Sequence, residues 1–463
     1  MINSLFRLIG KVADRLGLEC YVVGGYVRDK LLGIKNDDVD IVVVGSGIKM
    51  ASEFAKESGA SSVDYFQNFG TAKVNFKGIE VEFVGARKES YNRGSRKPIV
   101  EDGTLQDDQL RRDFTVNAMA ICLNSTRYGE LIDPFNGQGD LKKKRIVTPV
   151  DPLITFSDDP LRMLRCIRFA VKLGFNIDPV TFQAIKNNVD RIEIVSGERI
   201  TTELNKILLS PDPKRGISLL KDSGLLKKIL PEVDILDDSG GEGSYHHKNN
   251  FLHTIQVLEN VSNRSDGLWI RWAALLHDIG KEPTKHYDRE KGWTFYDHEH
   301  VGAVMVEKVF KRLKLPLDDK MKYVQKLVRM HMRPNMISTH EITDSAVRRL
   351  LSDAGDDIDD LLILCESDLT TKNLDKKNRI LGHFQRLKEM IADLKERDYK
   401  RLFQPCIGGN EIMELFNLRP CKEVGILKQA LKDAVLDEIV PNTESALKEL
   451  LILKGKELGL KVE

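Results

Sequence analysis

Short β-branched runs are concentrated in the first third of this 463-residue chain, and they constrain its fold more than any other feature. Four such runs precede residue 145: CYVVGG, VDIVVVG, TAKVNF and IEVEFVG. The first two are each followed by a segment with helical spacing, and the last two predict a β-hairpin around Lys77-Gly78. From about Asp158 apolar residues recur at every third and fourth position, as in helices. The sequence therefore predicts an α/β unit followed by an all-α remainder.

Length and linkers divide the chain into several domains. At roughly 150 residues per domain, we expect about three domains. Residues 237–244 contain three glycines and no apolar residue, so we expect a linker there. The segment that opens with QPCIGGNEIMELF predicts a final helical tail. We therefore expect four regions: 1–150, 151–236, 245–400 and 401–463.

Composition excludes several classes of protein. Hydrophobic residues make up 41% and charged residues 30%, so the chain can form a core and is not disordered. Lys+Arg number 71 against 70 Asp+Glu, which excludes a broadly basic protein but not a local basic stripe. No run of 18 apolar residues exists, and charges interrupt the apolar N-terminal positions, so we expect neither a membrane helix nor a signal peptide. The six cysteines form no CxxC pair, so we expect buried thiols and a reducing, cytoplasmic compartment.

Two aspartates, Asp38 and Asp40, lie one residue apart at the start of the run VDIVVV. The strand period of two places both carboxylates on one face, where they repel unless a cation lies between them. Two interpretations stay open for this pair alone: surface acids at a strand end, or a Mg²⁺ site that also binds triphosphate oxygens. Glu82 in IEVEFVG is a candidate third acid, and Glu80 competes with it for that role.

Gly24-Gly25 follows a predicted strand and opens a helix, with Arg28 one turn into it. Alone, the pair is either a tight turn or a backbone that lies close to a phosphate. Five segments in order, however, resemble motifs of the class II tRNA nucleotidyltransferase and bacterial poly(A) polymerase family: GGYVRDKLLG with the following DVD, RRDFTVNA, DPFNGQGDL, DDPLRMLRCIRF and ERITTEL.

This resemblance implies a polymerase-β-like nucleotidyltransferase head with a small mixed sheet, followed by a helical neck that binds RNA. Asp38 and Asp40 would ligate the catalytic Mg²⁺, with Glu82 as the third acid. Asp159 and Arg162 are three residues apart, and together they would read the base of the incoming nucleotide. The implied nucleotide-binding residues are Gly24, Gly25, Arg28, Arg111, Arg112, Asp113, Asn117, Asp159, Arg162, Arg165 and Arg168. For Arg165 and Arg168 a solvated helix face is the alternative.

The same resemblance implies an enzyme that adds CMP and AMP from CTP and ATP to the 3′ end of tRNA, without a template, by a two-metal in-line displacement. Poly(A) addition, and CC-only or A-only addition, are the alternatives. Residues 86–107 form a polar loop whose family counterpart is thought to influence whether C and A are both added; a plain surface loop is the alternative. The family usually has Glu where Asp158 stands, and we expect Asp158 to be a helix N-cap before Pro160.

All ten histidines lie between His246 and His383. With two aspartates they form the ordered pattern H…HD…H…H…D, which resembles the HD phosphohydrolase superfamily, an all-helical metal hydrolase fold. The resemblance implies a first divalent metal, of open identity, on His253, His277, Asp278 and Asp368, and a second on His298 and His331. We expect the other histidines to be ordinary surface or capping residues: His246, His247, His286, His300, His340 and His383.

An active HD domain would suit the trimming of 2′,3′-cyclic or 2′-phosphate ends before nucleotides are added. Lys281 would then contact a phosphate. The alternative from another class is an HD metal phosphohydrolase whose head only binds RNA. The intact Asp38/Asp40 pair argues against that alternative, because RNA binding alone needs no such pair. The sequence does not predict an oligomeric state.

Overall fold

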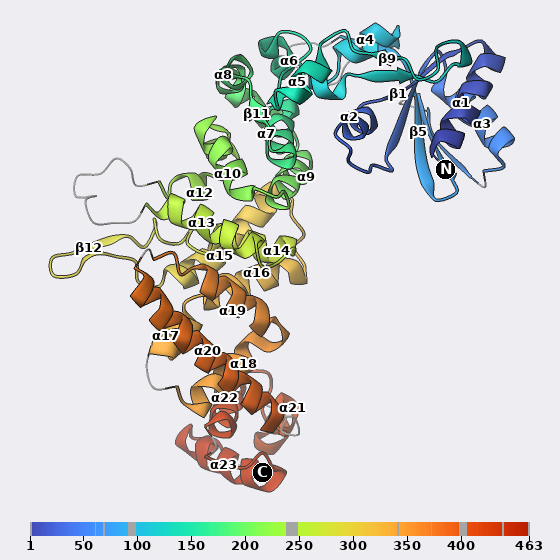
Figure 1. Ribbon diagram of the computed structural model, residues 1–463. Coiled ribbons are helices and arrows are strands. Elements are labelled where there is room, and N and C mark those ends of the chain that lie inside the picture. The colour runs from blue at the N-terminus through green and yellow to red at the C-terminus, as the bar shows by residue number, and fades with distance from the viewer. Residues whose placement is uncertain are drawn as a thin grey trace. The chain divides into compact units, whose positions relative to one another are not determined.

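The computed structural model describes residues 2–60, 62–67, 70–90, 99–237, 249–339, 342–371, 373–397, 405–437 and 439–461. The chain divides into two compact units, Met1–Ile235 with Lys311–Leu315, and Leu236–Phe310 with Pro316–Glu463. Figure 1 colours the chain by residue number. Some sequence expectations fall outside the described residues: positions 91–98 of the polar loop, positions 238–244 of the linker, His246, His247 and His340.

A seven-stranded mixed sheet forms the head, with the strand order β3-β4-β5-β2-β1-β8-β9. Its strands are β1 (Glu19–Val23), β2 (Val39–Val44), β3 (Val63–Phe66), β4 (Thr71–Phe76), β5 (Ile79–Gly85), β8 (Ala120–Cys122) and β9 (Leu131–Ile132). Neighbouring strands are antiparallel except β2 and β5, which are parallel. The predicted hairpin β4–β5 is present, and its turn residues Lys77 and Gly78 have φ of 52° and 85°, as a tight hairpin turn requires.

Helices cover the sheet of the head. Helix α1 (Ile2–Leu16) and helix α3 (Gly47–Ser58) pack against each other, and Figure 1 shows them on the side of the sheet opposite α2 (Gly25–Leu31). Phe54 of α3 is fully buried, and its ring centroid lies 5.4 Å from that of Phe83 on β5. A separate two-stranded ladder joins β6 (Arg87–Ser90) to β7 (Ile99–Asp102).

The neck continues the first unit with helices, as the apolar spacing predicts. The helices between β7 and the end of this unit's first segment, of which those from α6 onward form the neck, are α4 (Leu105–Leu110), η2 (Thr115–Asn117), η3 (Ser125–Arg127), α5 (Gly137–Lys142), α6 (Pro152–Asp158), α7 (Leu161–Leu173), α8 (Pro179–Asn188), η4 (Val189–Ile194), α9 (Gly197–Leu208), α10 (Pro213–Asp222), α11 (Leu225–Ile229) and α12 (Pro231–Asp234). One short exception to the helical pattern is β11 (Asn176–Ile177), which pairs in parallel with β10 (Arg145–Ile146).

The expected N-cap at Asp158 is wrong by one residue. Asp158 is the last residue of α6, and the carboxylate of Asp159 accepts a hydrogen bond from the backbone N–H of Leu161 at 3.3 Å. A residue that precedes proline avoids the helical region, so Asp159 before Pro160 is extended, with φ −129°. This residue therefore separates α6 from α7.

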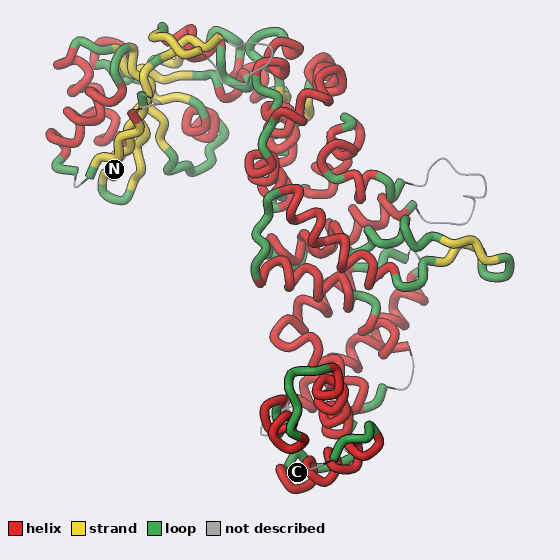
Figure 2. The backbone as a smooth tube through the Cα atoms, turned by 180° about the vertical axis from the view of Figure 1, so that it is seen from behind, coloured by secondary structure: helices red, strands yellow, loops and turns green. Residues whose placement is uncertain are grey.

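The second unit is mostly helical, as expected for residues 245–400. Its helices before the tail are α13 (Asn250–Ser262), α14 (Leu268–Leu276), α15 (His298–Leu313), α16 (Asp319–Met330), α17 (Arg333–Thr339), α18 (Asp344–Ala354), η6 (Gly355–Asp357), α19 (Ile358–Ser367) and α20 (Leu374–Arg397). A hairpin of β12 (His286–Asp288) and β13 (Gly292–Thr294) was not expected, and Figure 2 shows it in yellow against the red helices. Three-residue strands are too short for an alternating pattern to reveal them.

The C-terminal tail is helical, as predicted. It consists of α21 (Gly409–Phe416), α22 (Lys422–Leu436) and α23 (Glu444–Glu457). These helices share a core that contains Ile412, Phe416, Leu427, Leu431, Leu447 and Leu451. Among the described helices of the whole chain, none combines the length and the apolar character that a membrane crossing requires.

The expectation of buried thiols holds for four of the six cysteines. Cys20, Cys122, Cys166 and Cys365 are buried, whereas Cys406 and Cys421 are exposed. All six thiols are free. The two exposed thiols belong to the tail, where Cys406 precedes α21 and Cys421 immediately precedes α22.

Candidate functional site

The parallel pairing of β2 and β5 positions two of the predicted acids. In this register Asp40 is the direct partner of Glu82, so their side chains share one face of the sheet. Asp38 precedes β2 and is exposed. Glu80 forms an ion pair with Lys73 at 2.5 Å, and Lys73 lies 3.7 Å from Glu82. The register therefore places Glu82, rather than its competitor Glu80, beside Asp40.

Asp40 is in an unusual electrostatic environment. Burial and the neighbouring charge of Asp38 raise the pKa of Asp40 to about 6, although Arg112 acts in the opposite direction. A carboxylate whose charge is disfavoured by its surroundings gains from a nearby cation. Among the described residues, however, the oxygens of Asp38, Asp40 and Glu82 do not gather within 4.8 Å of one another. Protein carboxylates alone therefore do not enclose a cation in this arrangement.

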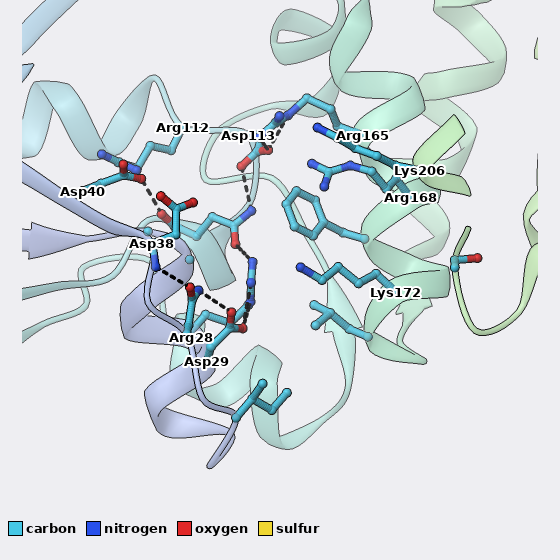
Figure 3. A pocket seen from close by; sticks show the side chains of 18 of the residues that line it. Arg28, Asp29, Asp38, Asp40, Arg112, Asp113, Arg165, Arg168, Lys172 and Lys206 are labelled. Atoms are coloured by element: carbon cyan, nitrogen blue, oxygen red, sulfur yellow. Dashed lines mark hydrogen bonds and ion pairs between the residues drawn. The ribbon is translucent and has the colours of Figure 1, made fainter. Parts of the chain in front are cut away.

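A cavity of about 950 Å³ opens beside the two aspartates. Figure 3 shows Asp38, Asp40 and Arg112 on one side and Arg165, Arg168, Lys172 and Lys206 on the other. Asp40 of the first side lies on β2, Asp38 precedes this strand and Arg112 follows α4, whereas the basic side comes from α7 and α9. Such a cavity suits a ligand that carries several negative charges and brings divalent cations with it.

Gly24 forms the edge of this cavity between β1 and α2. Its φ is +70°, a conformation that residues with a Cβ rarely adopt. A Cβ at this position would lie 3.0 Å from the Nη1 atom of Arg112 and 3.8 Å from the Oδ2 atom of Asp40. The glycine therefore leaves room for a ligand between these two side chains.

A chain of hydrogen bonds runs beneath the cavity from α2 to α7. Arg28 is 3% exposed; it pairs with Asp29 and donates to the Oδ1 atom of Asn117 at 2.6 Å. Asn117 donates in turn to Asp113 at 3.0 Å, and Arg165 donates twice to the other oxygen of Asp113, at 2.6 and 2.8 Å. We call these five residues the Arg28–Arg165 relay. Its hydrogen bonds link α2 to α7 and so fix the positions of these side chains at the cavity.

Four predicted residues do not line the cavity: Glu82, Arg111, Asp159 and Arg162. The guanidinium of Arg162 donates to the backbone oxygen of Arg111 at 2.6 Å, and Asp159 lies 3.6 Å from Arg199. The other predicted nucleotide-binding residues do line it: Gly24, Gly25, Arg28, Arg112, Asp113, Asn117, Arg165 and Arg168.

Lys172 and Lys206 are cavity residues that the sequence reasoning missed. Burial and the charge of Arg28 lower the pKa of Lys172. The spacing could have revealed this lysine, because Arg165, Arg168 and Lys172 recur at three and four residues along α7. Lys206 of α9 carries no comparable local signal, since only the packing of α9 against α7 brings it to the cavity.

The second unit contains two groups of possible metal ligands. One group is His253, His277 and Asp368, and the other is Asp278, His298 and His331. The structure thus brings together all six predicted residues. Asp278, which the resemblance assigns to the first metal, groups here with His298 and His331 and also lies 3.2 Å from His277 of the first group.

Asp278 faces both ligand groups. Its Oδ2 atom lies 3.2 Å from Nε2 of His277, and its Oδ1 atom lies 3.5 Å from Nε2 of His298. The two oxygens of one carboxylate thus point to different groups. A single residue could therefore bridge two cations.

The histidine rings are oriented for metal binding. The Nδ1 atoms of His277, His298 and His331 lie 2.6–2.9 Å from the backbone oxygens three residues earlier in the chain. Nδ1 of His253 lies 2.8 Å from the hydroxyl of Thr370. A carbonyl accepts only from N–H, so each of the three rings presents Nε2 to the cluster. Nε2 of His277 is buried and makes no hydrogen bond of good geometry within the described residues.

Carboxylates dominate the field at this centre. Burial alone would lower the pKa of His277, but Asp278 and Asp368 raise it to about 10. His331 differs, because burial and the charge of His277 lower its pKa to about 4. A field that holds a proton on a buried imidazole also favours a divalent cation there. Imidazole and carboxylate together suit transition metals and Mg²⁺.

A second cavity, of about 740 Å³, opens onto this centre. Its lining includes His253, Asp278, His298, His331 and Asp368, together with Lys281. The Nζ atom of Lys281 lies 2.7 Å from Asp278. Of the other described histidines, His286, His300 and His383 belong to neither ligand group.

Comparisons with known proteins identify the family of each region. Residues 20–147 match the family model of the poly A polymerase head domain, residues 174–236 match the probable RNA and SrmB-binding site of polymerase A, and residues 250–373 match the HD domain. An A-adding tRNA nucleotidyltransferase of Deinococcus radiodurans is 32% identical over 429 residues, which cover 89% of this chain and 90% of that protein.

Two further similarities cover large parts of the chain. A multifunctional CCA protein of Pseudomonas fluorescens is 35% identical over 311 residues, 65% of this chain and 72% of that protein. The solved structure of a CCA-adding enzyme with ATP is 25% identical, with a TM-score of 0.64, and the match covers 98% of this chain and 95% of that chain. The chain therefore belongs to the family of tRNA nucleotidyltransferases and poly(A) polymerases, is an enzyme of the nucleotidyltransferase class, and carries an HD domain.

Proposed function

We propose that this enzyme adds CMP and AMP to the 3′ end of tRNA from CTP and ATP, without a template. The cavity with acids on one side and bases on the other carries the proposal, because both the triphosphate and the RNA end are anionic. Addition of the terminal AMP alone is the second candidate. The relative that covers 89% of this chain, whose name describes an A-adding enzyme, favours that candidate.

Asp38 and Asp40 would hold Mg²⁺ in the head, and Glu82 would support Asp40 from the neighbouring strand. Hard carboxylate oxygens fit this ion, which takes its remaining ligands from substrate phosphates and water. Bound there, the ion would lower the pKa of the attacking hydroxyl and neutralise the leaving pyrophosphate. In the reaction the RNA 3′-oxygen bonds to the α-phosphorus, and the bond from that phosphorus to pyrophosphate breaks.

The chain's own residues would bind and orient the two substrates. Gly24 and Gly25 leave space for the triphosphate, and Arg112 lies beside it. Arg168 and Lys172 face the aspartates and suit RNA or nucleotide phosphates. We retain Asp159 and Arg162 as the residues that read the base, which requires them to leave their present partners, Arg199 and the oxygen of Arg111.

The Asp40→Ala variant tests the assignment of the head. We expect it to lose nucleotide addition almost completely while its circular dichroism and unfolding midpoint stay near those of the wild type. Asp64→Ala is the matched control, because Asp64 is an exposed acid on strand β3. Substantial incorporation by Asp40→Ala would refute the assignment.

Substrate choice is tested with tRNA that lacks its 3′ end and with tRNA that ends in CC. CTP and ATP are supplied singly and together. Addition that stops after three residues and needs both nucleotides supports CCA addition. Addition of one AMP, only to the tRNA that ends in CC, supports the A-adding alternative. A long A tail would support a poly(A) polymerase instead.

For the HD domain we propose a divalent-metal phosphohydrolase that removes 2′,3′-cyclic or 2′-phosphates from RNA ends. The oriented Nε2 atoms and the two-sided Asp278 support it. Water adds its oxygen to phosphorus, one ester P–O bond breaks, and the ester oxygen takes a proton. With Mg²⁺, Mn²⁺ or Ni²⁺ we expect activity that His277→Ala removes; its absence with all three metals would refute the proposal.

We also propose the four regions 1–150, 151–236, 245–400 and 401–463 as functional domains, and the cytoplasm as the compartment. The free thiols and the tRNA substrate support the compartment. For the tail, we propose a role in binding tRNA or in packing.

A further inference from the structure

The β12–β13 hairpin and the residues just after it expose two tyrosines beside a half-buried tryptophan, Trp293. Tyr287 is 59% exposed and Tyr296, just after β13, is 66% exposed. The rings of Tyr287 and Trp293 meet edge to face, with centroids 5.1 Å apart. Large aromatic side chains usually bury their faces, so a gathering at a surface indicates a binding role.

Lysine side chains accompany these rings. The Nζ atom of Lys285 lies 4.8 Å from the centroid of Trp293, and that of Lys291 lies 5.9 Å from the centroid of Tyr296. Asp288, an acid of the hairpin, accepts hydrogen bonds from the backbone N–H groups of residues 290 and 291 and so stabilises the turn. Rings interleaved with cations form the arrangement that binds single-stranded nucleic acid, since bases stack on rings and phosphates pair with cations.

The aromatic segment continues into the cavity of the HD centre. Trp293, Phe295 and Tyr296 line the same 740 Å³ cavity as His298 and Asp278. Lys281, also in this lining, lies 5.8 Å from the ring centroid of Phe295. The lining of this cavity therefore combines aromatic side chains with the metal-ligand groups.

We propose that the hairpin and residues 293–296 bind the single-stranded 3′ end of an RNA and deliver its terminal phosphate to the HD centre. Bases stack on Trp293 and Tyr296, and backbone phosphates contact Lys285 and Lys291. This inference rests on the proposed phosphohydrolase and adds the surface that would hold its RNA substrate.

The test compares two substrates of the full-length enzyme with divalent metal present. One is a single-stranded RNA of about 12 nucleotides that ends in a 2′,3′-cyclic phosphate. The other is glycerol 2-phosphate, which has no ring to stack. We expect Trp293→Ala and Tyr296→Ala each to raise KM for the RNA by about tenfold, the size of one lost stack. The ratio of kcat/KM for the RNA to kcat/KM for glycerol 2-phosphate should therefore fall by about tenfold in both variants.

Two control variants separate stacking from folding. Trp293→Phe keeps a ring and should restore most of the RNA affinity. Tyr65→Ala removes an exposed ring from strand β3 of the head, and it should leave KM for the RNA unchanged. Tyr296→Ala serves as the second variant if Trp293→Ala unfolds the hairpin. If both alanine variants keep the wild-type KM, the proposal that the hairpin and residues 293–296 bind RNA is wrong, whereas the proposed phosphohydrolase activity is unaffected.

Tryptophan fluorescence distinguishes the remaining outcome. The chain has three tryptophans, so the signal of Trp293 is the difference between the wild type and Trp293→Phe. RNA should quench this difference signal. Quenching without hydrolysis of either substrate would refute the phosphohydrolase activity but support RNA binding by the hairpin and residues 293–296. Absence of quenching would refute this RNA binding.

Discussion

At the residue scale, Asp113 is the centre of the Arg28–Arg165 relay. Burial alone would raise the pKa of Asp113, but Arg165 and the amide of Asn117 lower it below its ordinary value. The carboxylate therefore stays charged and accepts hydrogen bonds from both sides. A neutral residue of the same shape would leave Arg165 without its main counter-ion.

The first prediction concerns Asp113→Asn. We expect a loss of about 2 kcal/mol in the free energy of unfolding, below the usual value for a broken buried pair because Arg165 is partly exposed. Urea denaturation at neutral pH measures it. Asp64→Ala, an exposed acid, should change the stability little.

The same substitution predicts a pH dependence. A carboxyl with a lowered pKa in the folded state stabilises the protein above its unfolded pKa, about 3.9 for Asp, and less as the pH falls further. The stability difference between wild type and Asp113→Asn should therefore be constant near neutral pH and shrink below about pH 4. A difference that grows on acidification would contradict the assigned ion pair.

At the element scale, the metal centre depends on a close contact between two backbone segments. Gly280 follows the His277-Asp278 pair, and a Cβ built on it would lie 2.0 Å from the backbone oxygen of His298, the first residue of α15. No side chain fits there. The segment that carries His277 and Asp278 can therefore approach the start of α15, which carries His298, only because residue 280 has no side chain.

The second prediction is that Gly280→Ala destabilises the protein by about 2–3 kcal/mol, as overpacking does, and weakens divalent-metal binding. Gly382→Ala is the matched control. Gly382 lies inside helix α20 with nothing within 4 Å of a built Cβ, so alanine should stabilise the helix by about 0.5–1 kcal/mol. Unfolding curves and metal titrations of both variants measure the contrast; equal behaviour would contradict the packing argument.

At the scale of the whole molecule, the two units carry separate chemistries. Every residue that lines the head cavity belongs to the first unit, and both metal-ligand groups belong to the second. A ligand stabilises only the folded unit that binds it. Metal removal should therefore shift the unfolding transition of the second unit and leave that of the first unit unchanged.

The third prediction follows from this division. Chelation should lower the temperature of the second unit's unfolding transition, by the equivalent of about 2.7 kcal/mol if the metal had been at a hundredfold excess over its Kd. Calorimetry with and without chelator measures the shift. Asp278→Ala should abolish it and Asp40→Ala should preserve it. A shift that survives in Asp278→Ala would place the stabilising metal elsewhere.

Sequence predicts those features of this molecule that depend on local patterns. The β4–β5 hairpin follows from alternation around Lys77-Gly78. The choice of Glu82 over Glu80 required the register of β5 with β2, a pairing between distant segments that no local pattern encodes. The two-sided position of Asp278 depends on where α15 and α16 bring His298 and His331, which no local pattern encodes. The β12–β13 hairpin was missed because its strands are too short to show a period.

The Arg28–Arg165 relay also acts as a spacer. It connects α2 to α7 through side chains, so the gap between these helices depends on how long those side chains are. An added methylene, as in Asp113→Glu, would lengthen one link and move the basic wall relative to the acidic one. The width of the cavity therefore depends on the lengths of the relay side chains as well as on the residues of its two facing sides.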